Sequence, residues 1–390
     1  MVLTDLPSRV VTWLSSVRLR WGLVGLWAAW QLVMALTQGV MVSVDTQRYM
    51  RMAEGILQGH WPVGWDLLYT SYAAYLAFCF WVKGGYTLAV LGQVLASGLA
   101  ALALFDLGKR WASDARVGWL AAALFVAWPK FAEWNFIVYT DALFTYGGIG
   151  LLWGFYRIKR WPQAVAWVLG VGIVMMFRPM GMAIALGLWT MVLVRLVQWQ
   201  KNWLPTLGFL VVSLMAGLWI ITHYLAPSDY LFETRLDSYR ESEIIYPHIS
   251  LGLAPPSSFH EPDAGAPQGW GQLFGWNGAH IMKLAVIKLG LLFGHIKPYY
   301  TWYHNLFIAL YLYPIYLVAL RGIWYKRREA LTYFMLMFIA AQAGVVALTT
   351  ENWDGRFLLP LLPYLMLFGA VGFFAIRSLS RRETKPAKPA

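Results

Sequence analysis

Long apolar stretches recur along this 390-residue chain from near its beginning to near its end. A helix needs roughly 20 mainly apolar residues to cross the roughly 30 Å hydrocarbon layer of a membrane. Ten stretches approach or reach that length, at residues 21–42, 87–107, 117–132, 138–157, 163–177, 180–198, 203–225, 301–320, 331–349 and 357–377. Because 59% of the residues are hydrophobic, the chain has too few polar side chains to coat a soluble globule. The sequence therefore predicts an all-α, polytopic integral membrane protein with about ten transmembrane helices and external interfacial helices.

The charged residues between these stretches indicate the orientation. With a cytoplasmic amino terminus, most of the 31 basic residues fall inside and most of the 19 acidic residues fall outside, as the positive-inside rule requires. The same asymmetry makes the short apolar segments 68–83 and 281–297 interfacial or re-entrant helices on the outer side. We expect both termini in the cytoplasm. The membrane orientation then explains the net charge of +12. A nucleic-acid partner would require a basic face or a known motif, and the sequence has neither.

The predicted chain has three parts. Residues 1–225 form a transmembrane core whose first external loop, 43–86, carries the candidate site. Residues 226–300 form an external loop with an interfacial helix, and 301–390 form the last transmembrane helices and a basic cytoplasmic tail. The Pro- and Gly-rich stretch 226–280 is typical of a lid or acceptor-binding loop, and equally of a flexible connector.

The first external loop begins with a pattern typical of an interfacial helix. If residues 45–58 are helical, the 3.6-residue period places Asp45, Tyr49, Met52 and Ile56 along one stripe, with Arg48 at its flank. A second stripe is apolar and a third is polar, which suits a membrane surface. We therefore expect one short helix to hold a carboxylate and a guanidinium close together at the membrane boundary.

Each candidate in this part of the chain also has a purely structural interpretation. Asp45 could be a helix N-cap, and Asp141, in the motif YTDALF, could be another. Arg48 could extend its charge toward water from an apolar stem, and Tyr49 could anchor the helix at the interface.

Two later arginines also have alternative interpretations. Arg178, in MMFRPMG, could point outward to water or hold an anion beside Pro179. Arg356, in ENWDGRF, could pair with Glu351 or Asp354, or it could bind a phosphate.

Several other function classes find no support in the sequence. The seven histidines all fall outside, but none is spaced i, i+4 from another, which disfavours a dedicated histidine metal site. There is no GxxxxGK, CxxC or GxSxG motif, so nucleotide hydrolysis, a zinc finger and a serine-hydrolase elbow are not indicated. The single Cys79 excludes an internal disulfide framework.

A resemblance to a known family is carried by the run DTQRYMRMAEGILQGHW, the interfacial pair up to Lys83, LGKRW, and AALFVAWP ending in YTDALF. Over residues 21–200 the chain resembles the GT-C membrane glycosyltransferases. The similarity is to the protein O-mannosyltransferases and the lipid A aminoarabinose transferases in particular. That family carries, in its first external loop, an Asp in a D-x-x-R-Y context that acts as catalytic base or metal-linked acid. Asp45, Arg48 and Tyr49 match this context, and Asp141 matches the family's second acid.

The resemblance implies a polyprenyl-phosphate sugar as donor, with Asp45 and Asp141 as catalytic residues. The donor would be bound by Arg48, Tyr49, Arg178 and Arg356. Thr46 stands where the family often has Glu, which leaves the use of a divalent metal ion open. The segment GWDLLY also lacks the Lys that the aminoarabinose enzymes carry, which argues against their particular donor or acceptor.

We therefore expect a glycosyltransferase that moves a sugar to a glycan, lipid or protein acceptor on the outer face of the cell membrane, with inversion. Asp45 would be the general base, and Asp141 a supporting acid. A surface-glycan polymerase or ligase is one alternative. Another is a lipid or solute transporter without chemistry, which would place charged residues in mid-span. Asp106 and Arg195 lie near span ends instead, and no internal repeat indicates inverted halves.

Overall fold

The computed structural model describes residues 17–199, 208, 236–254, 256, 258–260, 269–352 and 354–383. Most of these residues are helical, as the apolar periodicity predicts. Four helices in the described part are long and apolar enough to cross a membrane, and they are α5 (Gly85–Ala112), α10 (Gly181–Trp199), α14 (Trp302–Lys326) and α15 (Ala330–Leu348). The fold is thus helical and consistent with a membrane protein.

The chain divides into two compact units. The first comprises residues 1–184, 313–332 and 359–390, and the second comprises 185–312 and 333–358. Besides part of α14, the first unit contains α2 (Val17–Thr37), α3 (Val44–Leu57), the 3₁₀ helix η1 (Gly64–Tyr69), α4 (Thr70–Trp81), α5, α6 (Ala115–Ala127), α7 (Pro129–Asn135), α8 (Thr140–Phe155), α9 (Trp161–Met175) and α16 (Leu362–Glu383).

The second unit contains most of α10 and α15, the first part of α14, and α13 (Gly269–Gly294). It also contains a pair of two-residue strands, β1 (Ile245–Tyr246) and β2 (Glu351–Asn352). The strands are parallel, with Ile245 opposite Glu351.

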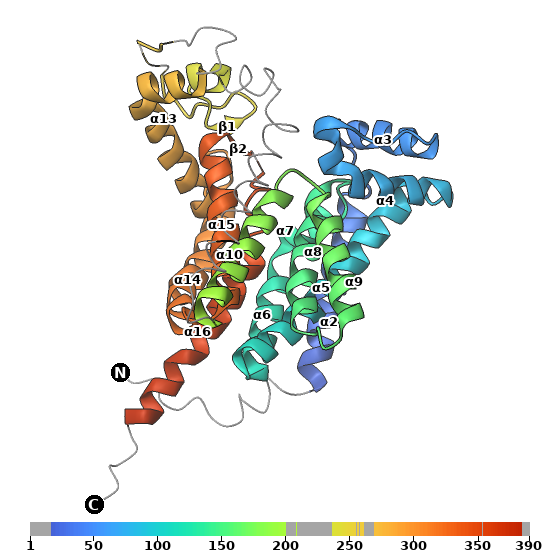
Figure 1. Ribbon diagram of the computed structural model, residues 1–390, viewed down its shortest axis with the longest axis vertical. Helices are drawn as coiled ribbons and strands as arrows, with labels where there is room; N and C mark the ends of the chain where they lie inside the picture. Colours follow the sequence, from blue (N-terminus) through green and yellow to red (C-terminus); the bar gives the residue numbers. More distant parts are fainter. Residues whose placement is uncertain are drawn as a thin grey trace, which may run out of the picture. The chain divides into compact units, whose positions relative to one another are not determined.

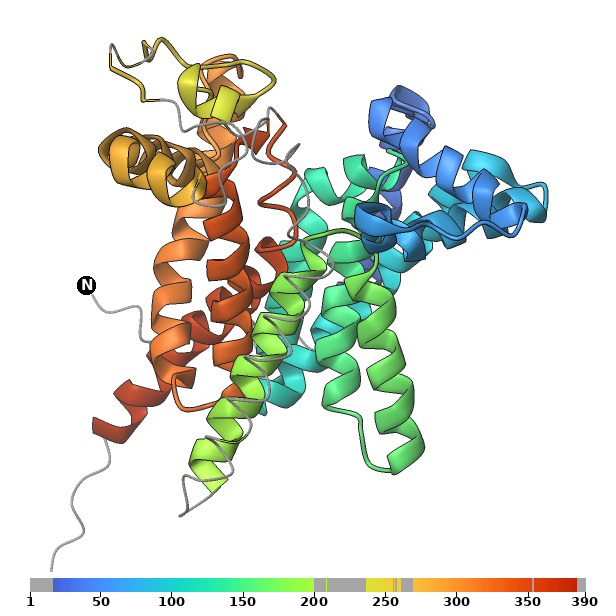
Figure 2. The same ribbon diagram turned by 45° about the horizontal axis from the view of Figure 1, so that its top comes forward.

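Helix α5 is the centre of the first unit, where it packs against α4, α6 and α8. Helix α3 packs on α4, and the two run across the ends of the bundle helices rather than alongside them (Figure 1). Figure 2 shows the same transverse layer from a second direction. The stretch 43–86, predicted as the first external loop, is thus helical over much of its length.

The backbones of α5 and α6 approach so closely that only glycine fits between them. A Cβ atom at Gly118 would lie 2.2 Å from the carbonyl oxygen of Phe105, and one at Gly108 would lie 2.9 Å from the Cα of Gly118. Such contacts between small residues are typical of helices packed within membranes, where burial of apolar surface adds little.

The predicted spans coincide with helices, with two qualifications. The stretch 203–225 lies outside the described residues except for Gly208. The prediction of one continuous span over 117–132 is wrong, because α6 ends at Ala127 and α7 begins at Pro129. Pro129 has no N–H group and excludes Trp128 from the helical region, and Trp128 indeed has φ −86° and ψ 107°.

Of the two predicted interfacial segments, 68–83 corresponds to α4, which spans Thr70–Trp81. The predicted short helix over 281–297 corresponds to the second part of α13, because non-helical dihedral angles at Asn277 divide this element, which begins at Gly269 and ends at Gly294, into two helices. The predicted external loop 226–280 lies partly outside the described residues.

Candidate functional site

Helix α3 spans Val44–Leu57, close to the predicted 45–58, and Ser43 is its N-cap residue. The backbone N–H of Ser43 donates to Thr46 Oγ1 at 2.9 Å, and the Thr46 hydroxyl donates to the carbonyl of Val138 at 2.9 Å. Asp45 is therefore the second residue of the helix, and its interpretation as the N-cap is wrong.

The carboxylate of Asp45 is held from outside its own helix. The Tyr139 hydroxyl donates a hydrogen bond to Asp45 Oδ2 at 2.6 Å, and both side chains are half-buried. Tyr139 is the N-cap residue of α8. The position of the Asp45 carboxylate thus depends on how the residues before Tyr139, which lead into α8, are held.

Backbone hydrogen bonds fix that segment on one side. The N–H of Met41, just before α3, donates to the carbonyl of Phe136 at 2.8 Å, and the N–H of Val138 donates to the carbonyl of Met41 at 2.9 Å. Together with the bond from Thr46, they tie the start of α3 to the residues that precede Tyr139.

A buried glutamine fixes the same segment on the other side. The side-chain amide of Gln93, on α5, donates to the carbonyls of Asn135 at 2.8 Å and Ile137 at 2.9 Å. Gln93 is fully buried, and its own carbonyl oxygen accepts a hydrogen bond from the Tyr72 hydroxyl at 3.1 Å. Two backbone carbonyls that would otherwise lack these bonds inside the protein are thereby satisfied.

Tyr49, which follows Asp45 by about one turn of α3, lies in a cluster of tyrosines. Its ring centroid is 5.5 Å from that of Tyr69, 5.2 Å from that of Tyr72 and 5.8 Å from that of Tyr139. Because only 3% of Tyr49 is exposed, the interpretation of this residue as an anchor at the membrane interface is wrong. It packs α3 against η1, α4 and the start of α8.

Arg48 points toward η1. Its Nε donates to Asp66 Oδ1 at 3.1 Å, its terminal nitrogen contacts the same oxygen, and its guanidinium lies 4.9 Å from the Tyr69 ring centroid. Partial burial acts to lower the pKa of Arg48, but the hydrogen bond and charge of Asp66 outweigh it and leave that pKa above its usual value. The described ion pair of Arg48 is thus with Asp66, rather than with the carboxylate one turn away.

Asp141 and Arg178 form a buried ion pair in the first unit. Asp141 is the second residue of α8 and is 1% exposed, whereas Arg178 lies between α9 and α10 and is 6% exposed. The interpretations of Asp141 as an N-cap and of Arg178 as an outward-pointing cation are therefore both wrong. A carboxylate in the first turn of a helix is also favoured by the helix dipole.

Tyr72 connects this ion pair to the tyrosine cluster. Burial raises the pKa of the Tyr72 hydroxyl well above its usual value, and the neighbouring Tyr49 and Asp141 raise it further. The hydroxyl therefore stays protonated, as its donation to Gln93 requires.

Arg356 belongs to the second unit. Its backbone N–H donates to Asp354 Oδ1 at 3.2 Å, and its guanidinium lies 5.1 Å from the Phe357 ring centroid. Glu351 instead forms a fully buried ion pair with Lys297 at 3.6 Å, and burial raises the pKa of Glu351 to about 7 against the opposing effect of Lys297.

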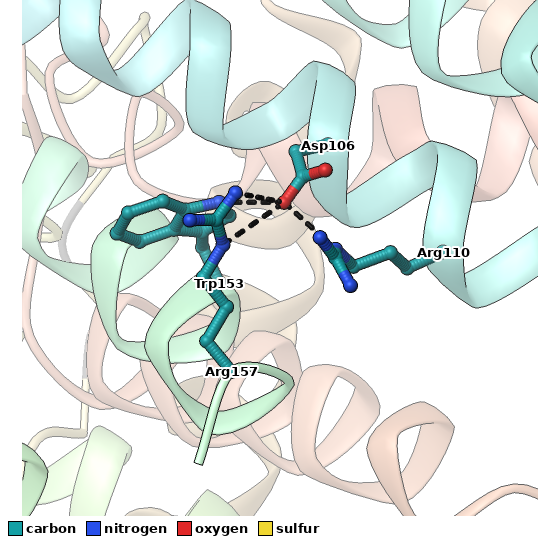
Figure 3. Close-up of polar contacts among 4 residues, drawn as sticks. All are labelled: Asp106, Arg110, Trp153 and Arg157. Carbon is teal, nitrogen blue, oxygen red and sulfur yellow. Dashed lines mark hydrogen bonds and ion pairs between the residues drawn. The ribbon is translucent and has the colours of Figure 1, made fainter. Parts of the chain in front are cut away.

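A second cluster of charged residues lies at the other end of α8. Asp106 Oδ2 accepts hydrogen bonds from Arg110 Nε at 2.8 Å, from Trp153 Nε1 at 3.0 Å, and from two nitrogens of Arg157 at 3.0 and 3.2 Å (Figure 3). All four bonds converge on one carboxylate oxygen. This arrangement clamps α5 to α8.

The carboxylates of Asp45 and Asp141 both have partners within the protein. Asp45 accepts from a tyrosine, and Asp141 is paired with an arginine. Within the described ranges, no group of three His, Cys, Asp or Glu residues could hold a metal ion.

Among protein-family models and curated proteins, none matches this chain. The site is therefore interpreted from its own residues. The sequence analysis missed Asp66, Gln93 and Tyr139. Tyr139 carried a usable signal, because it belongs to the same YTDALF motif as Asp141.

Proposed function

We propose that this protein is an inverting glycosyltransferase that moves a sugar from a polyprenyl-phosphate carrier to an acceptor hydroxyl at the outer face of the membrane. The observation that carries the proposal is at the beginning of α8. There Tyr139 holds the Asp45 carboxylate, and two residues later Asp141 holds Arg178.

In the proposed reaction Asp45 is the general base. It accepts the proton of the acceptor hydroxyl while the acceptor oxygen forms a bond to the anomeric carbon of the sugar. The bond from that carbon to the phosphate oxygen breaks, and its electron pair leaves with the phosphate. Tyr139 donates to one carboxylate oxygen and so orients the base, because general-base catalysis requires hydrogen-bond reach to the proton that is removed.

Arg178 is the proposed cation for the departing phosphate. A guanidinium has five N–H donors in a fixed plane, so it can contact a carboxylate and a phosphate together. The ion pair with Asp141 orients this plane, and the positive end of the α8 dipole adds to the attraction for an anion. Asp141 is thus a positioning residue that acts through Arg178.

The proposal includes the predicted membrane arrangement. Ten helices would span the cell membrane with both termini in the cytoplasm, and the α3–α4 layer would lie on the outer surface. The polyprenyl tail would stay in the bilayer while its phosphate reaches the beginning of α8. No step of the proposed reaction requires a divalent metal ion.

An activity assay tests the proposal. The purified chain in lipid nanodiscs would be given a panel of polyprenyl-phosphate sugars together with glycan, lipid and peptide acceptors. We expect a new glycosidic bond, with inverted configuration at the anomeric carbon by NMR. Long products would favour the polymerase alternative.

Movement of the polyprenyl-phosphate carrier across the membrane of vesicles, without any new glycosidic bond, would instead favour the transporter alternative. Either that movement alone, or the absence of transfer with every donor and acceptor by folded protein, would overturn the proposal.

A further inference from the structure

Helix α3, from Arg48 onward, forms one wall of an open pocket with a volume of about 370 Å³. The residues that line it are Arg48, Arg51, Met52, Gly55, His60, Trp61, Pro62 and Asp66. Asp45 is not among them. A volume of this size is within the roughly 300–1,000 Å³ of small-molecule sites.

The chain after α3 is built to fold back and close this pocket. Gly59 has φ +85°, and the N–H of His60 donates to the carbonyl of Gly55 at 2.8 Å, so the chain reverses against the last turn of the helix. A Cβ at Gly55 would lie only 3.3 Å from the His60 carbonyl oxygen. Gly64, with φ +60°, then turns the chain into η1 and brings Asp66 back to Arg48.

The polar residues of the pocket include both hydrogen-bond donors and acceptors. Arg48 and Arg51 donate, the Asp66 carboxylate accepts, and the His60 imidazole can do either. Asp66 balances the charge of Arg48, whereas Arg51 is exposed and forms no ion pair within residues 17–199. The pocket therefore offers directed hydrogen bonds with only a small excess of positive charge.

The indole of Trp61 adds a flat apolar surface. It is 63% exposed, although a tryptophan is among the most favourable residues to bury. An exposed ring beside convergent polar groups is available for stacking against a ligand. The apolar atoms of Met52 and Pro62 complete this side of the pocket.

This combination of groups matches a sugar ring better than a phosphate or a lipid chain. Sugar hydroxyls donate and accept, so they can use the guanidinium of Arg51 and the carboxylate of Asp66 together. The C–H face of a sugar is apolar and can lie flat on the indole of Trp61. For a phosphate the pocket offers only a small excess of positive charge, because Asp66 offsets Arg48, and a lipid chain would leave the charged groups unpaired.

We propose that the acceptor of the reaction is a glycan and that this pocket binds one of its sugar units through Trp61, Arg51 and Asp66. This inference rests on the proposed function. With a helical rise of about 1.5 Å per residue, Arg48 lies about 4.5 Å and Arg51 about 9 Å along α3 from Asp45. A glycan held in the pocket can therefore extend a neighbouring sugar to the base.

The first test measures binding without catalysis. The full chain, purified in detergent, is applied to an array of immobilised neutral oligosaccharides of two to six sugars. We expect binding by the wild type, a loss of about tenfold or more in affinity for Trp61→Ala and Arg51→Ala, and partial retention for Trp61→Phe. Trp161→Ala is the matched control, since Trp161 is 78% exposed on α9, and it should bind as the wild type does.

The binding assay can contradict the proposed sugar site in two ways. No binding to any neutral oligosaccharide, or equal binding by wild type and Trp61→Ala, overturns the inference. Binding that excess inorganic phosphate abolishes and that does not depend on Trp61 would identify an anion site and also overturn it. Because Trp61 and Arg51 are exposed, their truncation leaves the core intact, and thermal unfolding checks this.

A second test separates this inference from the proposed function. In the transfer assay with a glycan acceptor, Trp61→Ala should raise the KM for the acceptor by about tenfold with little change in kcat, the pattern of lost uniform binding. Sugar binding without any transfer would leave the pocket standing and remove the glycosyltransferase. Sugar transfer with an unchanged KM for the acceptor in Trp61→Ala would support the glycosyltransferase and overturn the proposed role of the pocket.

Discussion

The two ends of α8 hold the same kinds of residue in different ways. At its beginning, Tyr139 donates to Asp45 from α3, and Asp141 pairs with Arg178 in the buried interior. At its end, Trp153 and Arg157 donate to Asp106 from α5. Both ends tie α8 to other helices through carboxylates.

The difference lies in the donors to each carboxylate. One oxygen of Asp106 accepts four hydrogen bonds, three of them from guanidinium nitrogens, and such a charge-saturated oxygen is a poor proton acceptor. Asp45 Oδ2 accepts a hydrogen bond from a neutral phenol, whose hydroxyl orients the carboxylate. The cluster around Asp106 is thus a clamp, whereas Asp45 is the general base of the reaction that we propose.

The dipole of α8 does not distinguish the cluster at its beginning from the cluster at its end. Asp141 lies at the positive end of α8 and Arg157 just beyond its negative end, so both are favourably placed. A charged residue at a helix end is therefore weak evidence for a site until its partners are known.

The largest expected effect on stability comes from Asp141→Asn. The variant leaves the Arg178 guanidinium buried without its carboxylate, which costs about 3–5 kcal/mol when one partner of a buried pair is removed. Turnover should fall because Arg178 loses its orientation, but some activity should remain. Thermal unfolding and the transfer assay measure the two effects.

The double variant Asp141→Asn/Arg178→Gln is the control, because it removes both charges. It should recover much of the stability and none of the turnover. A single variant with wild-type stability and turnover would return Asp141 to a passive position in the first turn of the helix.

An effect of similar or smaller size is expected from Gln93→Leu, which removes the two hydrogen bonds to the segment before Tyr139. Each unsatisfied carbonyl costs about 1–3 kcal/mol, and turnover should fall as Tyr139 shifts from Asp45. Ser97→Ala is the matched control, because Ser97 is also buried on α5, and its hydroxyl accepts from Trp27 rather than bonding to this segment. Equal turnover in the two variants would contradict a positioning role for Gln93.

The smallest effect is expected at the other end of α8. Asp106→Asn weakens a partly exposed cluster and should lower stability by about 1 kcal/mol, since such pairs contribute little. Turnover should stay within about twofold of the wild type, because the clamp holds no reacting atom. A large loss of turnover in folded Asp106→Asn would remove the distinction between the two ends.

Much of the local structure could be predicted from the sequence. The period of residues 45–58 is strong enough that α3 is found within one residue at either end. The break before Pro129 was missed, although a proline at that place is itself a signal for it. What failed was the assignment of each charge to a partner from its place on one helix. Arg48 pairs with a residue 18 positions away, Arg178 with one 37 away, and Asp45 with one 94 away.

These contacts depend on tertiary packing, which the spacing within a single helix does not specify. A cap, a snorkelling arginine and an interface tyrosine were all reasonable for isolated helices. The buried glutamine on α5 was equally hidden, because one amide in an apolar run gives no sign of the backbone carbonyls that it holds. The residues of the candidate site were thus proposed from the sequence, whereas their partners were found only in the structure.

The most direct test compares Asp45→Asn with Asp106→Asn in one assay of sugar transfer from a polyprenyl-phosphate donor. Asparagine keeps the shape of Asp45 and can still accept a hydrogen bond from Tyr139, but it is a poor proton acceptor. We predict that Asp45→Asn unfolds near the wild-type temperature and loses about a hundredfold to ten-thousandfold in turnover, while Asp106→Asn remains close to the wild type. Wild-type turnover by folded Asp45→Asn would contradict the account.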